Sequence, residues 1–216
     1  IKIYENRIFV TDFKNVLKCF SINDGKELWS LKTDNSFVKS QKKLSIILTK
    51  NIVFFNNTLG DISAVDLYKG KLIWQTPTQD SSIFESSFQL KTSDLIISDK
   101  RILFSNNKNE FYSLDIKTGT LIWKKKISSS VKPIAMENLV FTISENGFFI
   151  ILDANTGDII RITDIFDSIK EKKRSKVKPV GFVFGKKNVY LTTSNGHLIV
   201  INIVTGKSNL IKKIDN

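Results

Sequence analysis

Short hydrophobic runs alternate with polar turns along the whole chain. The runs at residues 52–55 and 102–104 are rich in β-branched and aromatic side chains, and a turn rich in Asn, Ser or Gly follows each. A second apolar run comes next, at residues 62–67 and 111–116. Runs of this kind between such turns are typical of antiparallel strands joined by hairpins. We therefore expect strands rather than helices.

The same pattern recurs five times, with a turn glycine about every 45 residues. Each copy holds three clear strands, and a weaker apolar segment between copies supplies a fourth, at residues 44–48, 88–90, 134–136 and 180–184. The chain begins just before what we take as the second strand of the first copy. Four strands in about 45 residues is the size of one propeller blade.

We therefore expect an all-β protein, a β-propeller of four-stranded antiparallel blades, with about five blades in a single partial domain over residues 1–216. The predicted repeat units lie approximately at 1–36, 37–84, 85–130, 131–166 and 176–216. A basic inter-blade loop is expected at residues 167–178.

Three residue types recur at fixed places in the units and are predicted to hold the blades together. An aspartate that starts a turn can accept backbone N–H bonds across it, and the glycine that ends the turn can adopt a positive φ. A tryptophan four residues after the glycine is predicted to pack between blades rather than to stack on a ligand. These structural residues are Asp66, Asp115, Asp153, Gly25, Gly70, Gly119, Gly157, Gly206, Trp29, Trp74 and Trp123.

Composition places the 216-residue chain among ordinary globular proteins, with 41% hydrophobic and 25% charged residues and a formal net charge of +12. Only four basic residues are arginines: Arg7, Arg101, Arg161 and Arg174. Because nucleic-acid readers depend on the forked guanidinium group, this lysine-rich charge argues against a nucleic-acid partner. The single cysteine excludes an internal disulfide and a thiolate metal cluster.

The predicted inter-blade loop carries a dense run of positive charge. Its solvated lysines could simply aid solubility, and the functional alternative is a docking loop for an acidic protein surface or anionic lipid. Neutralising Lys172, Lys173, Arg174 and Lys176 is expected to leave stability nearly unchanged while weakening partner binding. The candidate partner-binding residues are Lys170, Lys172, Lys173, Arg174, Lys176 and Lys178.

No group of residues along the chain suggests catalysis. Cys19 falls where the other units carry Ala64, Ser113 or another small or apolar residue, which predicts a buried core position. His197 stands alone at the start of a predicted strand and has no metal-ligating neighbour in sequence. We therefore predict no catalytic, cofactor-binding or metal-binding residues.

The repeats resemble those of quinoprotein-like (PQQ-type) β-propellers. The pattern A-x-D-x-x-T-G-x-x-x-W of that family is similar to Ala64, Asp66, Gly70 and Trp74 of the second unit. The resemblance implies a ring of seven or eight radial blades, of which this chain would be a part. The later units depart from the pattern, since Arg161 and Leu210 replace Trp and Asn202 replaces Asp.

Within this family, the short linkers and the lack of enzyme signatures are most similar to the accessory lipoprotein of the outer-membrane β-barrel assembly machine, the BamB type. That resemblance implies a non-catalytic periplasmic scaffold without a cofactor, attached to the outer membrane by an N-terminal lipid. Its expected partners are the central barrel-assembly subunit and unfolded barrel precursors.

Two other functions stay open. One is a fragment of a PQQ-dependent dehydrogenase. Resemblance to that class implies a quinone held beneath a disulfide of adjacent cysteines, with a metal ligated by Glu, Asn and Asp. The other is the extracytoplasmic sensor propeller of a bacterial kinase. The sequence upstream of Ile1 would separate them, because each class carries different features there.

Overall fold

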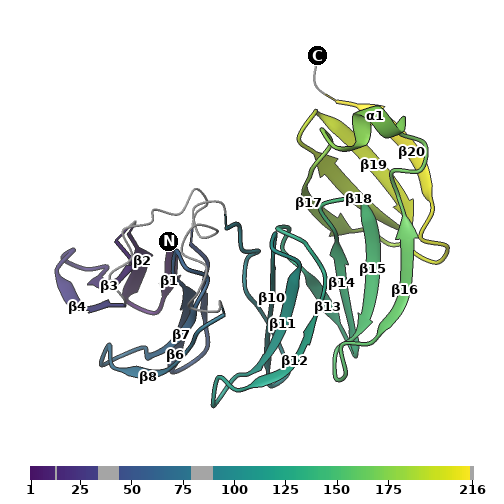
Figure 1. Ribbon diagram of the computed structural model, residues 1–216. Helices are drawn as coiled ribbons and strands as arrows, with labels where there is room; N and C mark the ends of the chain where they lie inside the picture. Colours follow the sequence, from purple (N-terminus) through teal and green to yellow (C-terminus); the bar gives the residue numbers. More distant parts are fainter. Residues whose placement is uncertain (13, 34–43, 79–89, 215–216) are drawn as a thin grey trace.

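The computed structural model describes residues 1–12, 14–33, 44–78 and 90–214. Across these residues, twenty strands form five four-stranded antiparallel sheets, each made of four consecutive strands. The all-β propeller architecture predicted from the repeats is therefore confirmed. Figure 1 shows the five sheets as successive blades along an open arc.

The strands of blades 1 to 3 are β1 (Lys2–Tyr4), β2 (Arg7–Thr11), β3 (Val16–Ser21), β4 (Glu27–Lys32), β5 (Ile46–Leu48), β6 (Ile52–Asn56), β7 (Ile62–Asp66), β8 (Leu72–Thr76), β9 (Ile96–Ser98), β10 (Arg101–Asn106), β11 (Glu110–Asp115) and β12 (Leu121–Lys125). Blades 4 and 5 consist of β13 (Ile134–Met136), β14 (Leu139–Ile143), β15 (Phe148–Asp153), β16 (Ile159–Asp164), β17 (Pro179–Phe184), β18 (Asn188–Thr193), β19 (His197–Asn202) and β20 (Ser208–Lys213). One helical turn, α1 (Glu171–Arg174), lies between blades 4 and 5.

Three local expectations need correction. Blade 1 has its own first strand, because β1 pairs with β2 in the register Lys2 to Phe9, so the chain does not begin just before a second strand. The first strand of blade 3 is β9, and most of the apolar segment at 88–90, where we expected this strand, lies outside the described residues. The segment at 167–178 is not wholly a loop, since it contains α1.

All five blades share one irregularity. The pairing between the third and fourth strands shifts register at the same place in each blade, for example between Ala64 and Val65 and between Ser113 and Leu114. A bulge of this kind bends a strand and increases its local twist. Because the shift recurs, the bend falls at the same place in every blade.

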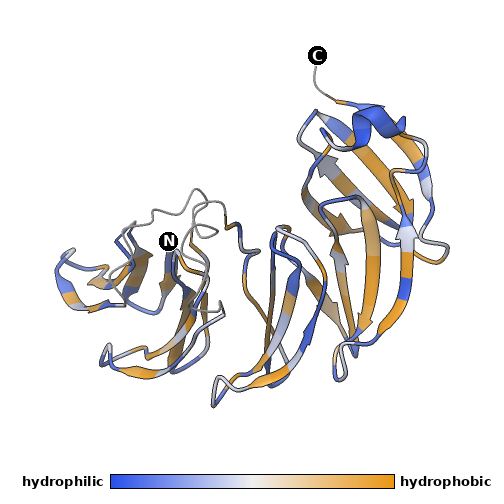
Figure 2. Ribbon diagram, in the orientation of Figure 1, coloured by the Kyte–Doolittle hydropathy of each residue, from blue (hydrophilic) through white to orange (hydrophobic). Residues whose placement is uncertain are grey.

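The hydrophobic core is divided into layers between neighbouring blades. One buried cluster joins Phe9 and Cys19 of blade 1 to Val53 and Val65 of blade 2, and three similar clusters fill the following junctions. Figure 2 shows apolar colour along the strands and polar colour on α1. Each junction therefore buries apolar side chains from two neighbouring blades, as in other repeat proteins.

The burial patterns record how many neighbours a blade has. In blade 3, β10 is buried at five successive residues, because layers cover both faces of the sheet. In blade 5, β18 alternates between buried and exposed residues, since blade 4 covers only one face. The first strands lie on the inner side of the arc, where β1 contacts β5 and β9 contacts β13.

Candidate functional site

The outer strands of blades 1 to 3 carry the three tryptophans, and each reaches the following blade. Each indole N–H donates to a backbone carbonyl in the turn between the third and fourth strands of that blade. The pairs are Trp29 Nε1 to the Leu67 oxygen at 3.1 Å, Trp74 Nε1 to Ile116 at 3.3 Å, and Trp123 Nε1 to Ala154 at 3.0 Å. In every case the acceptor residue directly follows the turn aspartate.

The indole rings fill the space between two blades. The Trp74 ring lies 5.8 Å from the Phe54 ring of its own blade, measured between centroids. On its other side it covers Gly119 of blade 3, where a Cβ atom would lie 2.5 Å from Trp74 Cε3. Gly119 also has a φ of +72°, so both its conformation and its neighbour require glycine. Gly70 and Gly157 meet Trp29 and Trp123 in the same way.

The turn aspartates hold the loops that receive these rings. Asp115 Oδ1 accepts backbone N–H bonds from Lys117 and Thr118, each at 2.9 Å, and these bonds lower the pKa of this carboxyl group. Asp66 and Asp153 accept the equivalent pairs of bonds. The carbonyl that binds the indole is therefore presented by a turn with a fixed shape.

Arg161 takes the tryptophan position in blade 4. Its guanidinium donates to two backbone carbonyls of blade 5, those of Val204 and, at 2.7 Å, Ile203. Ile203 directly follows Asn202, so Arg161 reaches the same carbonyl position that the indoles reach elsewhere. In the sequence pattern, Arg161 is visible only as a departure from the repeat. Its position in the repeat is the signal that could have revealed this role, because the other units carry an N–H donor there.

The basic segment at residues 167–178 contains one arginine with a different role from its lysines. Arg174 is half-buried, and it donates from Nη2 to Asp164 at 2.6 Å and from Nε to the Phe166 carbonyl at 2.9 Å. Arg174 therefore ties the segment to the end of β16. This differs from the expectation that its charge could be removed with little effect. The lysines of the segment are all exposed: Lys170, Lys172, Lys173, Lys176 and Lys178.

Cys19 and His197 lie apart from each other. Cys19 is fully buried between blades 1 and 2. Burial raises the pKa of its thiol, and the nearby positive charge of Arg7 offsets this rise only in part. His197 is half-buried at the start of β19. Within the described residues, no group of three or more His, Cys, Asp or Glu side chains is placed to hold a metal ion.

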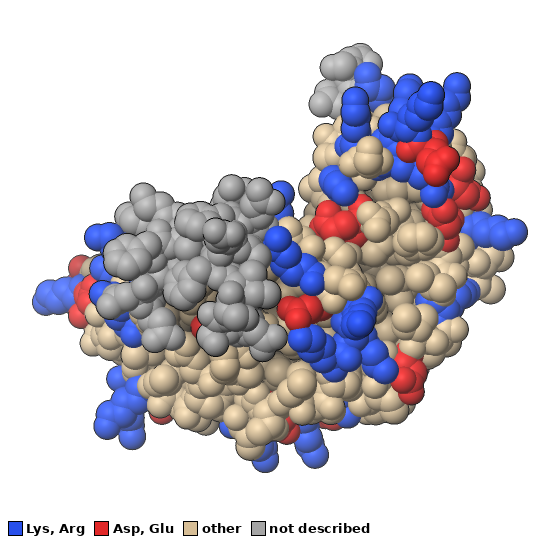
Figure 3. Space-filling view, viewed as in Figure 1, with Lys and Arg blue, Asp and Glu red and all other residues tan. Residues whose placement is uncertain are grey.

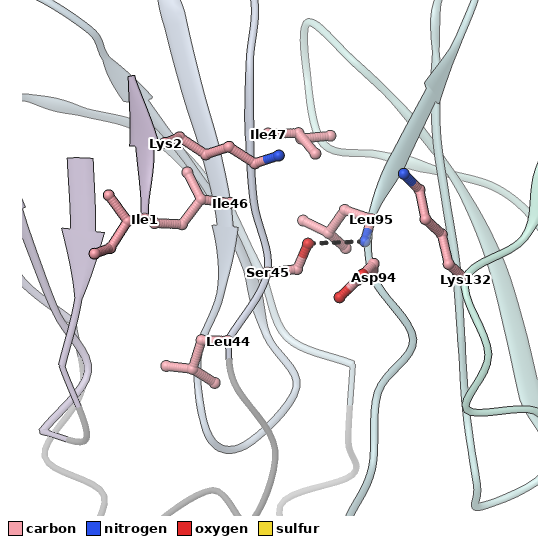
Figure 4. A pocket seen from close by; sticks show the side chains of 9 residues that line it. All are labelled: Ile1, Lys2, Leu44, Ser45, Ile46, Ile47, Asp94, Leu95 and Lys132. Atoms are coloured by element: carbon pink, nitrogen blue, oxygen red, sulfur yellow. Dashed lines mark hydrogen bonds between the residues drawn. The ribbon is translucent and has the colours of Figure 1, made fainter. Parts of the chain in front are cut away.

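A small pocket opens on the inner side of the arc, lined by residues from blades 1 to 3 and by Lys132, which precedes β13 of blade 4. Its volume is about 120 Å³, and it lies between the first strands, where Ser45 Oγ accepts a hydrogen bond from the Leu95 N–H at 3.0 Å. In Figure 4 the ammonium groups of Lys2 and Lys132 lie to either side of Leu95, with the Asp94 carboxylate below. The lining is therefore mixed, with aliphatic side chains beside two lysines and one aspartate.

The helices among the described residues include none with the length and apolar character needed to span a membrane.

A family model described as outer membrane protein assembly factor BamB matches residues 1–163 of the chain. No curated protein matches by sequence.

The solved structures that share the fold of the chain include three PQQ-type proteins. BamB from Moraxella catarrhalis matches with a TM-score of 0.78 and 16% identity, over 98% of this chain and 62% of that one. Quinohemoprotein alcohol dehydrogenase from Comamonas testosteroni matches with a TM-score of 0.77 and 12% identity, over 98% of this chain and 42% of that one. The quinohemoprotein alcohol dehydrogenase ADHIIG from Pseudomonas putida HK5 matches with a TM-score of 0.73 and 13% identity, over 99% of this chain and 41% of that one. The chain thus spans less than two thirds of the length of each protein.

Proposed function

Because this chain belongs to the outer membrane protein assembly factor BamB family, we propose that it is a non-catalytic scaffold in the assembly and insertion of β-barrel proteins into the outer membrane. The observation that carries the proposal is the family match over residues 1–163. The proposed location is the periplasm, with attachment to the outer membrane through an N-terminal lipid. The proposed partners are the central barrel-assembly subunit and unfolded barrel precursors.

The blade architecture suits such a role. Indole and guanidinium contacts join each blade to the next, so the hairpins at the two rims are held at set positions relative to one another. Loops on a rigid support are the usual place for recognition residues, because they can vary without disturbing the core. The scaffold would therefore act by positioning its partner rather than by reacting with it.

The test is to purify the native full-length protein from the envelope of its source after mild cross-linking. We expect the central barrel-assembly subunit to co-purify in near-equal amount, and the mature chain to begin at a lipid-modified cysteine. Deleting the gene should lower the amount of folded barrel proteins in the outer membrane, and the native gene should restore it. Unchanged barrel proteins together with no co-purified subunit would contradict the proposal.

A quinoprotein dehydrogenase is the second candidate, because two such enzymes share the fold with TM-scores close to that of BamB. The residues present fit that cofactor poorly. The chain has one cysteine, so it offers no pair of adjacent cysteines, and Cys19 is buried between blades. Incubating the full-length protein with pyrroloquinoline quinone and Ca²⁺ tests this candidate directly. Tight quinone binding with alcohol-dependent reduction of a dye would favour the enzyme over the scaffold.

A further inference from the structure

Folding brings two further lysines, Lys212 and Lys213, to the basic segment. Lys178 is joined to the β18–β19 hairpin, since its N–H donates to Ser194 Oγ at 3.1 Å and its carbonyl accepts from the Ser194 N–H at 2.8 Å. The end of β20 meets the same hairpin, where Lys213 pairs with His197. Lys212 and Lys213 therefore share one rim of blade 5 with the basic segment, although more than thirty residues separate them in sequence.

This basic rim consists of seven exposed lysines: Lys170, Lys172, Lys173, Lys176, Lys178, Lys212 and Lys213. No acidic side chain among the described residues forms an ion pair with any of them. The exposed acids in the same segment are Asp167 and Glu171. Figure 3 shows Lys and Arg side chains gathered over α1 at this end of the molecule. The rim therefore carries a concentrated positive charge that faces solvent.

The chemistry of the rim favours a diffuse anionic surface over a shaped protein partner. Protein interfaces are depleted in lysine and enriched in arginine. Here the one arginine of the segment is already used, because Asp164 and the Phe166 carbonyl bind its guanidinium. The remaining groups are mobile point charges, which suit a layer of lipid phosphates that offers many equivalent contacts.

We propose that the basic rim is a contact surface for anionic phospholipid headgroups, and that it orients blade 5 toward a membrane. The proposal rests on the proposed function in that it requires a site of action at a membrane. Each lysine near an anionic bilayer adds a small attraction, and several together produce appreciable binding. Salt should weaken this binding, because charges on an exposed surface are screened over about 8 Å at physiological ionic strength.

The experiment measures binding of the purified protein to vesicles of phosphatidylethanolamine with and without phosphatidylglycerol. The rim variant is K170Q/K172Q/K173Q/K212Q/K213Q, and the matched control is K50Q/K69Q/K71Q/K100Q/K207Q. The control lysines are also exposed and lie in the turns at the opposite rim. Both variants lose the same net charge, so only the position of the charge differs. Thermal unfolding of both variants verifies that they remain folded.

We expect the native protein to bind only the vesicles with phosphatidylglycerol, the rim variant to bind them at least about tenfold more weakly, and the control variant to change less than about threefold. Equal losses in the two variants, or no native binding to anionic vesicles, would overturn the proposal. If the rim variant kept its vesicle binding but lost its binding to the barrel-assembly subunit, the rim would be assigned to an acidic protein instead. The vesicle result does not depend on that subunit, so it can fail or succeed separately from the proposed function.

Discussion

At the residue scale, each tryptophan uses both parts of its side chain at a blade junction. The Trp74 ring packs between Phe54 and Gly119, and its N–H reaches a carbonyl of blade 3. A smaller side chain would leave a cavity at the junction and an unpaired carbonyl.

We expect Trp74→Ala to lower the free energy of unfolding by about 3 kcal/mol or more. Urea denaturation of the variant and the native chain measures this loss. Trp74→Phe serves as the control, since it keeps an aromatic ring and removes the N–H donor. A loss below about 1 kcal/mol in Trp74→Ala would show that the residue does not join the blades.

Two turn glycines allow a matched comparison, because Gly119 faces the ring of Trp74 and Gly25 faces open space. Gly119 and Gly25 have φ angles of +72° and +69°, but a Cβ atom at Gly25 would meet nothing within 4 Å. Gly25→Ala should cost about 1 kcal/mol from backbone conformation alone. Gly119→Ala should cost at least about 2 kcal/mol more, because its Cβ would collide with Trp74. Equal losses in urea denaturation would mean that the ring moves freely.

At the element scale, strands β10, β11 and β12 of blade 3 share a charged network. Burial penalises the charged form of Glu110, but hydrogen bonds from Lys124, Tyr112 and Asn106 outweigh this penalty and lower the pKa of Glu110 below its ordinary value of 4.5. A lowered pKa means that the folded state favours the ionised carboxylate. The network therefore adds stability above pH 4.5, and this contribution disappears as the pH falls through the folded-state pKa.

We expect the native chain to lose more stability than Glu110→Gln when the pH is lowered from about 6 to about 3, since the variant lacks the titrating group. Urea denaturation across this range gives the comparison. Parallel curves for the two proteins would exclude a contribution from Glu110.

The basic segment separates into an anchor and free charges. Arg174 holds it to β16, whereas Lys172 is exposed and has no ion pair among the described residues. Arg174→Gln should cost about 1 kcal/mol in the free energy of unfolding, and Lys172→Gln should change it by less than about 0.5 kcal/mol. Thermal unfolding of the two variants compares them. Equal stability would show that Arg174 does not anchor the segment.

At the scale of the whole molecule, stability depends on each blade and its neighbours. Within the described residues, blade 4 covers one face of blade 5, and Arg161 supplies polar contacts between these two blades. In repeat proteins a unit can open separately when an interface with its neighbour is weakened.

We expect Arg161→Ala to raise amide hydrogen exchange in β17–β20 at least about tenfold and to leave blades 1 to 3 unchanged. Ile160→Ala, on the exposed side of the same strand, is the matched control. Faster exchange spread over all five blades would instead indicate a molecule that opens as a unit.

The strand pattern and the repeat were sufficient to predict the blade architecture, because hydrophobic alternation and turn residues act within a few positions of each other. The repeated glycines and tryptophans also had a clear positional signal. Only the tertiary structure decided which atoms those residues contact, since their partners lie in the next blade, about 40 residues away. It alone showed that Arg161 replaces an indole donor, that Arg174 is an anchor, and that Lys212 and Lys213 join the basic segment. Contacts between distant segments depend on how blades stack, and no local pattern records that stacking.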